Sequence, residues 1–302
     1  MDRVTVNRAA SMPKLELSRI IYGMWRLADD ENRDVSHVQQ KVEACLAQGI
    51  TSFDQADIYG DYESERLFGK LLKDAPQLLD KIEIITKCDI KLLTDKSPER
   101  VVKHYDTSAA HINQSVDNSL RLMNVDHIDM LLLHRPDPLM DHHETGSALD
   151  ALIASGKIGS VGVSNFKPWD INLLQSAMSN PIVCNQIEIS LLAHDAFTNG
   201  DVVYAQEKNI ALMAWSPLAG GGLFDPSNKA LLDKLTAIGE SQGYDASAVA
   251  VAWLLAHPAA ILPVMGTNNL DRIATLGDAC KVKLDRETWF VLYEMALGQE
   301  VP

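Results

Sequence analysis

Eight short apolar runs alternate with segments of helical period along the chain, and this alternation constrains the fold more than any other feature. A short apolar run bounded by turn residues is typical of a buried strand, whereas apolar residues at every third or fourth position are typical of an amphipathic helix. We expect strands at residues 20–24, 50–54, 82–87, 128–133, 158–163, 182–187, 210–215 and 261–264. We expect helices at residues 36–48, 63–73, 108–123, 145–155, 168–177, 201–208, 230–242, 246–256, 270–278 and 285–297.

Repeated strand–helix units predict an α/β fold with a parallel sheet. Eight such units favour a closed (β/α)8 TIM barrel, here with an extra C-terminal helix, and 302 residues suit one such barrel. We therefore expect a single barrel domain over residues 1–302, with a doubly wound open sheet as the alternative. A polar stretch at residues 88–107 interrupts the alternation of strands and helices and is expected to be irregular.

Charge and hydropathy argue against several classes of partner. The chain has 27 basic and 41 acidic residues, a net charge of −14. Without a basic stripe, this balance argues against nucleic acid or an anionic membrane as the principal partner. No apolar run is long enough to span a membrane, and the N-terminal residues lack the apolar core of a signal peptide. We expect a soluble, cytoplasmic protein.

The cysteines and histidines lack the spacing of a metal site. Cys45, Cys88, Cys184 and Cys280 lie far apart and form no CxxC pair. Separate thiols of this kind are typical of proteins in a reducing compartment. The histidine pair at residues 142–143 is expected to begin a helix. We expect no metal.

Polar side chains close three of the expected strands. Asp54, Lys87 and His134 each follow an apolar run, and Tyr59 lies five residues beyond Asp54. The carboxyl ends of the strands of a parallel barrel meet on one face, where active sites form. A phenol, an ammonium group, a carboxylate and an imidazole can together deliver a proton to a carbonyl oxygen while a hydride reaches its carbon. The glycines at residues 220–222 lack the G-x-G-x-x-G spacing of a Rossmann site.

These motifs make the sequence resemble the aldo-keto reductase superfamily over nearly its whole length. The segment at residues 49–69, GITSFDQADIYGDYESERLFG, is similar to the first signature of that family. Further similar segments are IITK at 84–87, LLLHRPD at 131–137, GVSNF at 162–166, NQIE at 185–188 and AWSPL at 214–218. Within the superfamily the chain is most similar to the bacterial YdhF-type oxidoreductases.

The resemblance implies a catalytic role for four residues. Tyr59 would be the general acid, Lys87 would supply the charge that makes the phenol more acidic, and Asp54 would hold Lys87. His134 would orient and polarise the carbonyl group. Taken singly, a strand-end aspartate is often a helix cap and a tyrosine often only packs, so the prediction depends on the four residues in their order.

The resemblance also implies NADP(H) as the cofactor. Ser164, Asn165 and Gln186 would bind the nicotinamide carboxamide, and Trp215 would stack on the ring. Trp25 would also form an aromatic wall of the substrate pocket. The full set of expected cofactor-binding residues is Gly23, Met24, Trp25, Asp54, Ser164, Asn165, Gln186, Trp215, Ser216, Pro217, Leu218, Gly266, Thr267, Asn268 and Arg272.

The sequence departs from the family pattern where the 2′-phosphate of NADP would bind. Many members have a lysine at the position of Gly266 and a Glu-Asn pair at the positions of Thr275 and Leu276. Recognition of the phosphate would therefore depend on Arg272 and on groups at residues 266–268, next to a helix N-terminus.

Two other functions remain alternatives at this stage. One is a cofactor-binding, redox-sensing regulatory subunit with little turnover, like the aldo-keto-reductase-type β subunits of potassium channels, which retain the same four residues. A Schiff-base enzyme that uses Lys87 as a nucleophile is the other alternative, but it leaves Tyr59 and the NQIE segment unexplained. The expected partner is a small carbonyl substrate, and the sequence specifies neither that substrate nor the oligomeric state.

Overall fold

The computed structural model describes residues 1–6 and 14–302. Eight parallel strands close a barrel and pair in chain order, and the last strand pairs with the first. The strands are β3 (Ile21–Gly23), β4 (Ser52–Asp54), β5 (Glu83–Cys88), β8 (Met130–Leu133), β9 (Val161–Ser164), β10 (Ile182–Glu188), β11 (Ala211–Trp215) and β12 (Leu262–Met265). The expected TIM barrel is confirmed, and each expected strand overlaps one barrel strand.

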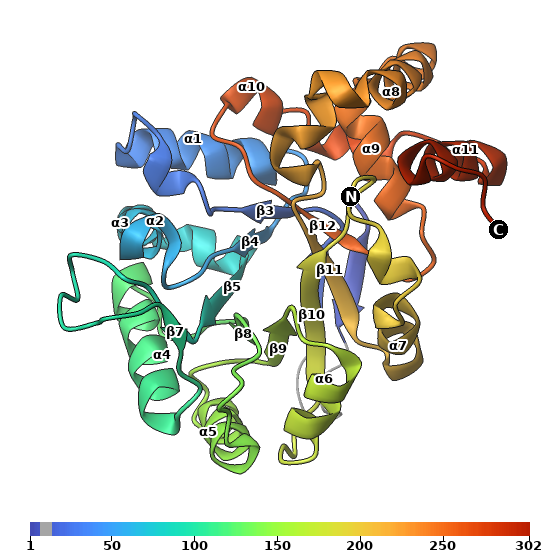
Figure 1. Cartoon of the computed structure of the whole chain (residues 1–302). Coiled ribbons are helices and arrows are strands. Elements are labelled where there is room, and N and C mark those ends of the chain that lie inside the picture. Colours follow the sequence, from blue (N-terminus) through green and yellow to red (C-terminus); the bar gives the residue numbers. More distant parts are fainter. Residues whose placement is uncertain (7–13) are drawn as a thin grey trace.

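Helices surround the barrel on the outside (Figure 1). They are α1 (Val35–Leu46), α2 (Tyr59–Tyr62), α3 (Ser64–Asp74), α4 (Ala109–Met123), α5 (His142–Ala154), α6 (Pro168–Gln175), α7 (Asp201–Lys208), α8 (Lys229–Gln242), α9 (Ala246–Leu255), α10 (Leu270–Ile273) and α11 (Arg286–Leu297). Short 3-10 helices lie at Leu27–Asp29, Pro76–Lys81, Asp195–Phe197, Ala219–Phe224, Pro226–Asn228 and Leu276–Cys280. Among the described residues, no helix is long and apolar enough to cross a bilayer.

A small antiparallel sheet closes the amino end of the barrel. Its strands β1 (Arg3–Val6) and β2 (Leu15–Ser18) pair just before β3 begins. Leu15 and Leu17 are buried in one cluster with inward-facing strand residues such as Ile85 and Met130. The sequence analysis missed this sheet because each strand has only four residues. With the amino end covered, the carboxyl ends of the strands form the open face of the barrel.

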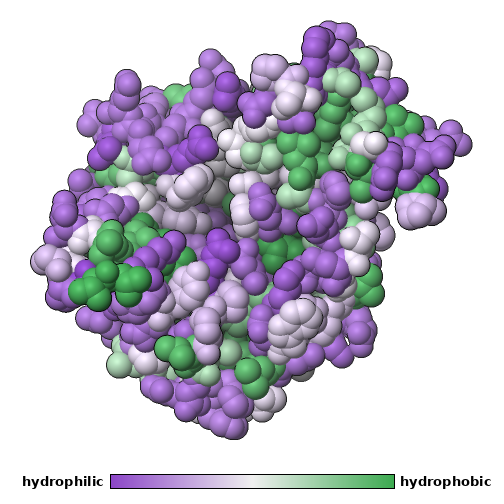
Figure 2. Space-filling view, viewed as in Figure 1, coloured by the Kyte–Doolittle hydropathy of each residue, from purple (hydrophilic) through white to green (hydrophobic). Residues whose placement is uncertain are grey.

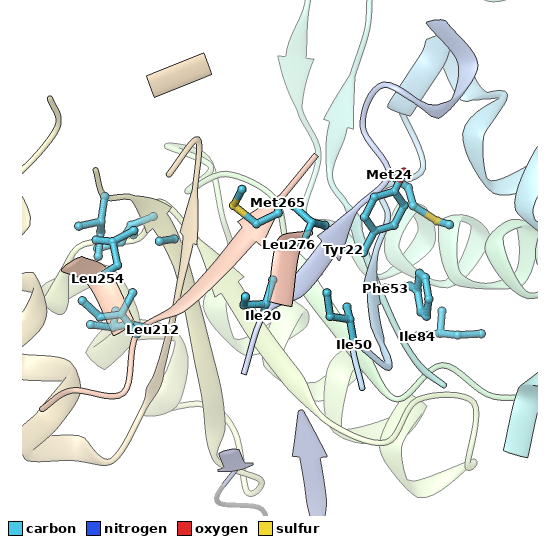
Figure 3. Close-up of a cluster of buried hydrophobic side chains, with 14 of the residues drawn as sticks. Ile20, Tyr22, Met24, Ile50, Phe53, Ile84, Leu212, Leu254, Met265 and Leu276 are labelled. Atoms are coloured by element: carbon cyan, nitrogen blue, oxygen red, sulfur yellow. The ribbon is translucent and has the colours of Figure 1, made fainter. Parts of the chain in front are cut away.

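The main core lies between the barrel and the helices. Figure 3 shows part of it, where Tyr22, Phe53 and Ile84 extend from neighbouring strands. Phe53 contacts Tyr22 edge to face, with ring centroids 6.0 Å apart, and stacks on Phe68 of α3 at 5.8 Å. These aromatic contacts fix α3 against the strand that carries Asp54.

The C-terminal helix expected from the sequence packs on α9 through two tryptophans. The rings of Trp253 and Trp289 stack with centroids 4.7 Å apart. Each indole N–H donates to the other residue's main-chain carbonyl, at 3.1 and 2.9 Å. Both buried polar tips are therefore satisfied, which is what a buried tryptophan requires.

Two expectations about local structure were wrong. The helix expected at 270–278 is broken, because the Gln48 amide inserts between the groups that a continuous helix would join. Gln48 Nε2 donates to Ile273 O, and the Gly277 N–H donates to Gln48 Oε1, both at 2.7 Å. The stretch at 88–107 is not wholly irregular, because β6 (Ile90–Lys91) pairs with the antiparallel β7 (His104–Tyr105).

Candidate active site

Three of the four expected catalytic residues meet at one buried ammonium group. Lys87 lies in β5 and is fully buried. Its Nζ donates to Asp54 Oδ2 at 2.6 Å, to the Tyr59 hydroxyl at 2.9 Å and to Gln55 O at 2.9 Å. An ammonium group has three N–H donors, so these three hydrogen bonds satisfy all of them.

The Lys87 ammonium and the Tyr59 phenol keep their protons at neutral pH. Burial favours a neutral Lys87, but Asp54 and the Tyr59 oxygen outweigh it and raise the pKa of the lysine. Burial likewise raises the pKa of Tyr59, and the charge of Lys87 opposes this effect only in part. The pKa of the phenol is thus raised, not lowered as the sequence analysis expected of a tyrosine beside a lysine, because desolvation is the larger effect.

His134 follows β8 and lies beside Tyr59. The two rings meet edge to face, with centroids 5.9 Å apart. Burial, followed by the charges of Lys87 and Arg135, holds the pKa of His134 well below its ordinary value, so the imidazole is neutral. Its Nδ1 is buried and has no hydrogen-bond partner in the described part of the chain. The fourth expected catalytic residue therefore offers a neutral ring next to the phenol.

A hydrogen-bonded chain joins the ends of β9, β10 and β11. Gln186 Nε2 donates to Asp54 Oδ1 at 2.9 Å, and the Ser164 hydroxyl donates to Gln186 O at 2.9 Å. Asn165 donates to Ser164 Oγ at 2.8 Å and accepts from Trp215 Nε1 at 3.0 Å. The structure thus brings together the residues expected at the nicotinamide. It also shows that Gln186 supports Asp54, which the sequence did not indicate.

The residues expected after β3 and β11 lie at the same open end. The side chain of Met24 is buried in the core, whereas the side chain of Trp25 is 57% exposed. Ser216 has a φ of 48° and begins a loop that includes Gly220 and Gly221, at 65° and 108°. Pro217 and Leu218 lie within this loop, buried and half-buried respectively. Left-handed residues of this kind turn successive main-chain N–H groups towards one side, where they can face an anion.

The segment after β12 is held by a lysine that the sequence analysis missed. Lys41 of α1 is fully buried, forms an ion pair with Asp30 and donates to Asn268 Oδ1 at 2.9 Å. The neighbouring Thr267 accepts at its carbonyl oxygen from the Tyr22 hydroxyl at 2.7 Å. The Lys41 and Tyr22 side chains therefore fix the orientation of residues 267–268. The signal that could have identified Lys41 was a charged residue on the apolar side of an amphipathic helix, where such a residue is rarely buried without a partner.

Arg272 is exposed near the same segment, beyond Gly266. Its side chain makes no hydrogen bond or ion pair with residues 1–6 or 14–302. The N–H of Arg272 is capped by Asn269 Oδ1 at 2.9 Å, and α10 is a single turn. The helix whose N-terminus was expected to hold an anion is thus shorter than predicted, and that N-terminus is partly satisfied. The exposed guanidinium of Arg272 remains as a cation without a hydrogen bond or ion pair to the described residues.

Two carboxyl groups outside the expected set lie behind the site, on the half-buried Asp57 and the buried Glu65. Asp57 accepts from the Ser115 hydroxyl at 2.8 Å, and Glu65 accepts from the Thr86 hydroxyl at 2.6 Å. Burial raises the pKa of each to about 7. Their presence within the 49–69 signature was visible in the sequence, but their burial was not.

The fold and the site define a barrel oxidoreductase with a tyrosine–lysine–aspartate cluster at the carboxyl ends of its strands. The chain belongs to the Aldo/keto reductase family, whose sequence profile matches residues 19–294. Members of this family generally bind a nicotinamide cofactor and act on small carbonyl compounds. Family membership makes the chain an enzyme of the oxidoreductase class and does not favour the regulatory alternative.

Relatives cover the full length of the chain. A 6-dehydroglucose reductase of Agrobacterium fabrum is 61% identical over 98% of this chain and 100% of its own length. The oxidoreductase YdhF of Escherichia coli is 39% identical over 95% of this chain and 96% of its own, which confirms the expected similarity.

Among solved structures, a glycerol dehydrogenase from Gluconobacter oxydans is similar with a TM-score of 0.84 and 22% identity, covering 98% of this chain and 95% of its own. An aldo/keto reductase from Klebsiella pneumoniae, in complex with NADP and acetate, has a TM-score of 0.75 at 22% identity and covers 93% and 92%. At this identity both likenesses support the fold.

Proposed function

We propose that this protein reduces aldehydes or ketones to alcohols with NADPH, and that Tyr59 is the general acid. The observation that carries the proposal is the 2.9 Å contact between the Tyr59 hydroxyl and Lys87, which also binds Asp54. A reduced nicotinamide would supply the hydride that reaches the carbonyl carbon. The phenol would give its proton to the carbonyl oxygen, completing the alcohol.

The other residues would serve this proton transfer. The Lys87 ammonium would stabilise the tyrosinate that Tyr59 becomes, because the two groups are already hydrogen bonded. Asp54, held by Lys87 and Gln186, would keep the ammonium in place. The neutral imidazole of His134 would donate a hydrogen bond to the carbonyl oxygen and orient it.

The polar groups at the open end fit a nicotinamide dinucleotide. Ser164, Asn165 and Gln186 offer hydroxyl and amide groups at adjacent strand ends, and the half-buried Trp215 offers a flat ring beside them. The left-handed loop from Ser216 would face the pyrophosphate. Arg272 would bind the 2′-phosphate that distinguishes NADP from NAD. An NADP complex of a protein with the same fold supports this choice.

For the substrate, we propose a hydroxylated aldehyde such as 6-dehydroglucose, a glucose with an aldehyde at carbon 6. Two relatives carry the name 6-dehydroglucose reductase, and one is 61% identical over 98% of this chain. Steady-state oxidation of NADPH with 6-dehydroglucose should exceed that with an aldehyde of the same chain length that lacks hydroxyl groups.

The general acid is tested by Tyr59→Phe. Because general acid catalysis contributes about 10²–10⁴-fold, carbonyl reduction should fall by that factor while the Kd for NADPH stays nearly unchanged. Retained reduction would exclude Tyr59 as the acid. A wild-type protein that binds NADPH tightly and reduces no aldehyde would favour the regulatory alternative.

A further inference from the structure

The turn that follows Tyr59 has a backbone that most residues avoid. Gly60, Asp61 and Tyr62 lie in succession in the left-handed region, with φ values of 58°, 52° and 67°. Glycine adopts this region without steric cost, but Asp61 and Tyr62 do so only where their surroundings impose it. Since Tyr59 is joined directly to the turn, whatever imposes this backbone also fixes the direction of the phenol.

One side of the turn packs against a neighbouring 3-10 helix. A Cβ atom on Gly60 would lie 2.2 Å from the Cβ of Ala28 in Leu27–Asp29. Glycine is therefore required at residue 60 both by the conformation and by this close approach. The contact blocks movement of the turn towards the 3-10 helix, and other groups must restrain the turn in the remaining directions.

The turn also contacts the excursion, which we define as residues 92–103 between β6 and β7. Lys96 Nζ donates to the main-chain oxygen of Asp61 at 2.5 Å and to Glu63 Oε1 at 2.6 Å. The first bond satisfies a carbonyl group of the left-handed turn. The second reaches the residue at which right-handed backbone resumes before α3.

A second cation of the excursion binds the third residue of the turn. The Tyr62 hydroxyl accepts from Arg100 Nη1 at 3.0 Å and from the Leu92 N–H at 3.2 Å. Arg100 Nη1 also donates to Leu92 O at 3.0 Å. Leu92 at the start of the excursion, Arg100 near its end and the Tyr62 side chain are thus joined at one place.

The excursion does not owe its position to burial of its apolar side chains. Leu93, Val101 and Val102 are 62%, 91% and 59% exposed. Figure 2 shows a hydrophobic area at the left edge, where the excursion runs in Figure 1. Since these side chains face outward, the polar contacts of Lys96 and Arg100 hold the excursion against the turn.

We propose that Lys96 and Arg100 are positioning residues for Tyr59. Together with the Ala28 contact, they clamp the left-handed turn and so keep the phenol within hydrogen-bond distance of Lys87. The inference rests on the proposed function of Tyr59 as the proton donor, and it assigns the excursion a role in turnover.

The test is the double variant Lys96→Met/Arg100→Met, which keeps apolar side chains of similar length and removes both cations. With the phenol no longer held, kcat for aldehyde reduction should fall about tenfold or more, and the Kd for NADPH should stay within about twofold. Glu99→Met is the matched control, because Glu99 lies between the two cations, is exposed and has no hydrogen bond or ion pair with the described residues. It should behave as wild type.

Two further measurements separate positioning from a general loss of structure. Adding Asp61→Gly to the double variant should restore part of kcat, since glycine adopts the left-handed backbone without the steric cost that the clamp otherwise offsets. The tyrosinate absorbance titration assigned to Tyr59, by subtraction of Tyr59→Phe, should shift in the double variant, because the burial of the phenol and its contact with Lys87 both set its pKa.

Three results would each contradict the proposed role of Lys96 and Arg100. They are an unchanged kcat in the double variant, an unchanged titration of Tyr59, and a loss of kcat that Asp61→Gly does not recover. If the wild-type protein reduces no aldehyde, the proposed function fails, while the titration still tests whether the clamp positions the phenol.

Discussion

At the scale of single residues, the Lys87 ammonium connects the strand ends of the site. It is fully buried and binds Asp54, Gln55 and Tyr59. Lys87→Met should therefore abolish carbonyl reduction and also destabilise the fold by about 3–5 kcal/mol, because Asp54 would be left as an unpaired buried charge. Urea unfolding and NADPH oxidation measure the two effects.

The same prediction has an internal control. Lys87→Met/Asp54→Asn removes the orphaned charge, so stability should recover in part while activity stays lost. If the double variant were as unstable as Lys87→Met, the instability would come from packing and not from charge.

Arg272 is the residue on which the choice of cofactor should depend. Its guanidinium is exposed and free within the described chain, and a guanidinium can meet a phosphate through two charge-assisted hydrogen bonds. Arg272→Ala should weaken NADPH binding by roughly 10- to 100-fold, at ~1.4 kcal/mol per decade, and leave NADH binding nearly unchanged. Fluorescence titrations with both cofactors measure this, with the exposed Arg286→Ala as control. An equal loss of affinity for NADPH and NADH would mean that Arg272 does not bind the 2′-phosphate.

At the scale of secondary-structure elements, α3 and α4 approach so closely that only glycine fits between them. A Cβ atom on Gly69 would lie 1.9 Å from the main-chain oxygen of Leu122 and 2.6 Å from Met123 Cα. Backbone atoms cannot yield as a side chain can, so Gly69→Ala should lower the free energy of unfolding by roughly 2–4 kcal/mol. Gly222→Ala is the control, since its nearest neighbour would lie at an ordinary 3.7 Å. A Gly69→Ala variant as stable as wild type would show that the two helices can separate freely.

At the scale of the whole molecule, buried carboxyl groups should make stability depend on pH. Burial raises the pKa of Glu65 from 4.5 to about 7 in the folded protein. The folded state therefore binds more protons than the unfolded state between these values, and stability falls as pH rises from about 4.5 to about 7. For one carboxyl group the loss is on the order of 3–4 kcal/mol, at ~1.4 kcal/mol per pKa unit.

Glu65→Gln removes this titration and keeps an acceptor for the Thr86 hydroxyl. The decrease in unfolding free energy between pH 5 and pH 8 should be smaller in the variant than in wild type by roughly 1–3 kcal/mol. The exposed Glu240→Gln on α8 should change nothing. Parallel pH profiles for Glu65→Gln and wild type would mean that Glu65 is ionised in the folded state.

The sequence by itself determined the strands, the barrel they form and the order of the residues at their ends. Hydrophobic period is a local property, so each barrel strand could be located from a few neighbouring residues. Asp54, Lys87 and His134 were found for the same reason: each follows such a run, and a parallel barrel brings the ends of its strands to one face.

Only the tertiary structure decided which groups meet and how they are protonated. The Gln48 amide that breaks the expected helix and the Gln186 amide that holds Asp54 come from distant segments. The raised pKa of Tyr59 likewise follows from burial created by residues far away in the chain. Contacts of this kind and desolvation depend on the packed arrangement of many elements, which no local pattern of residues encodes.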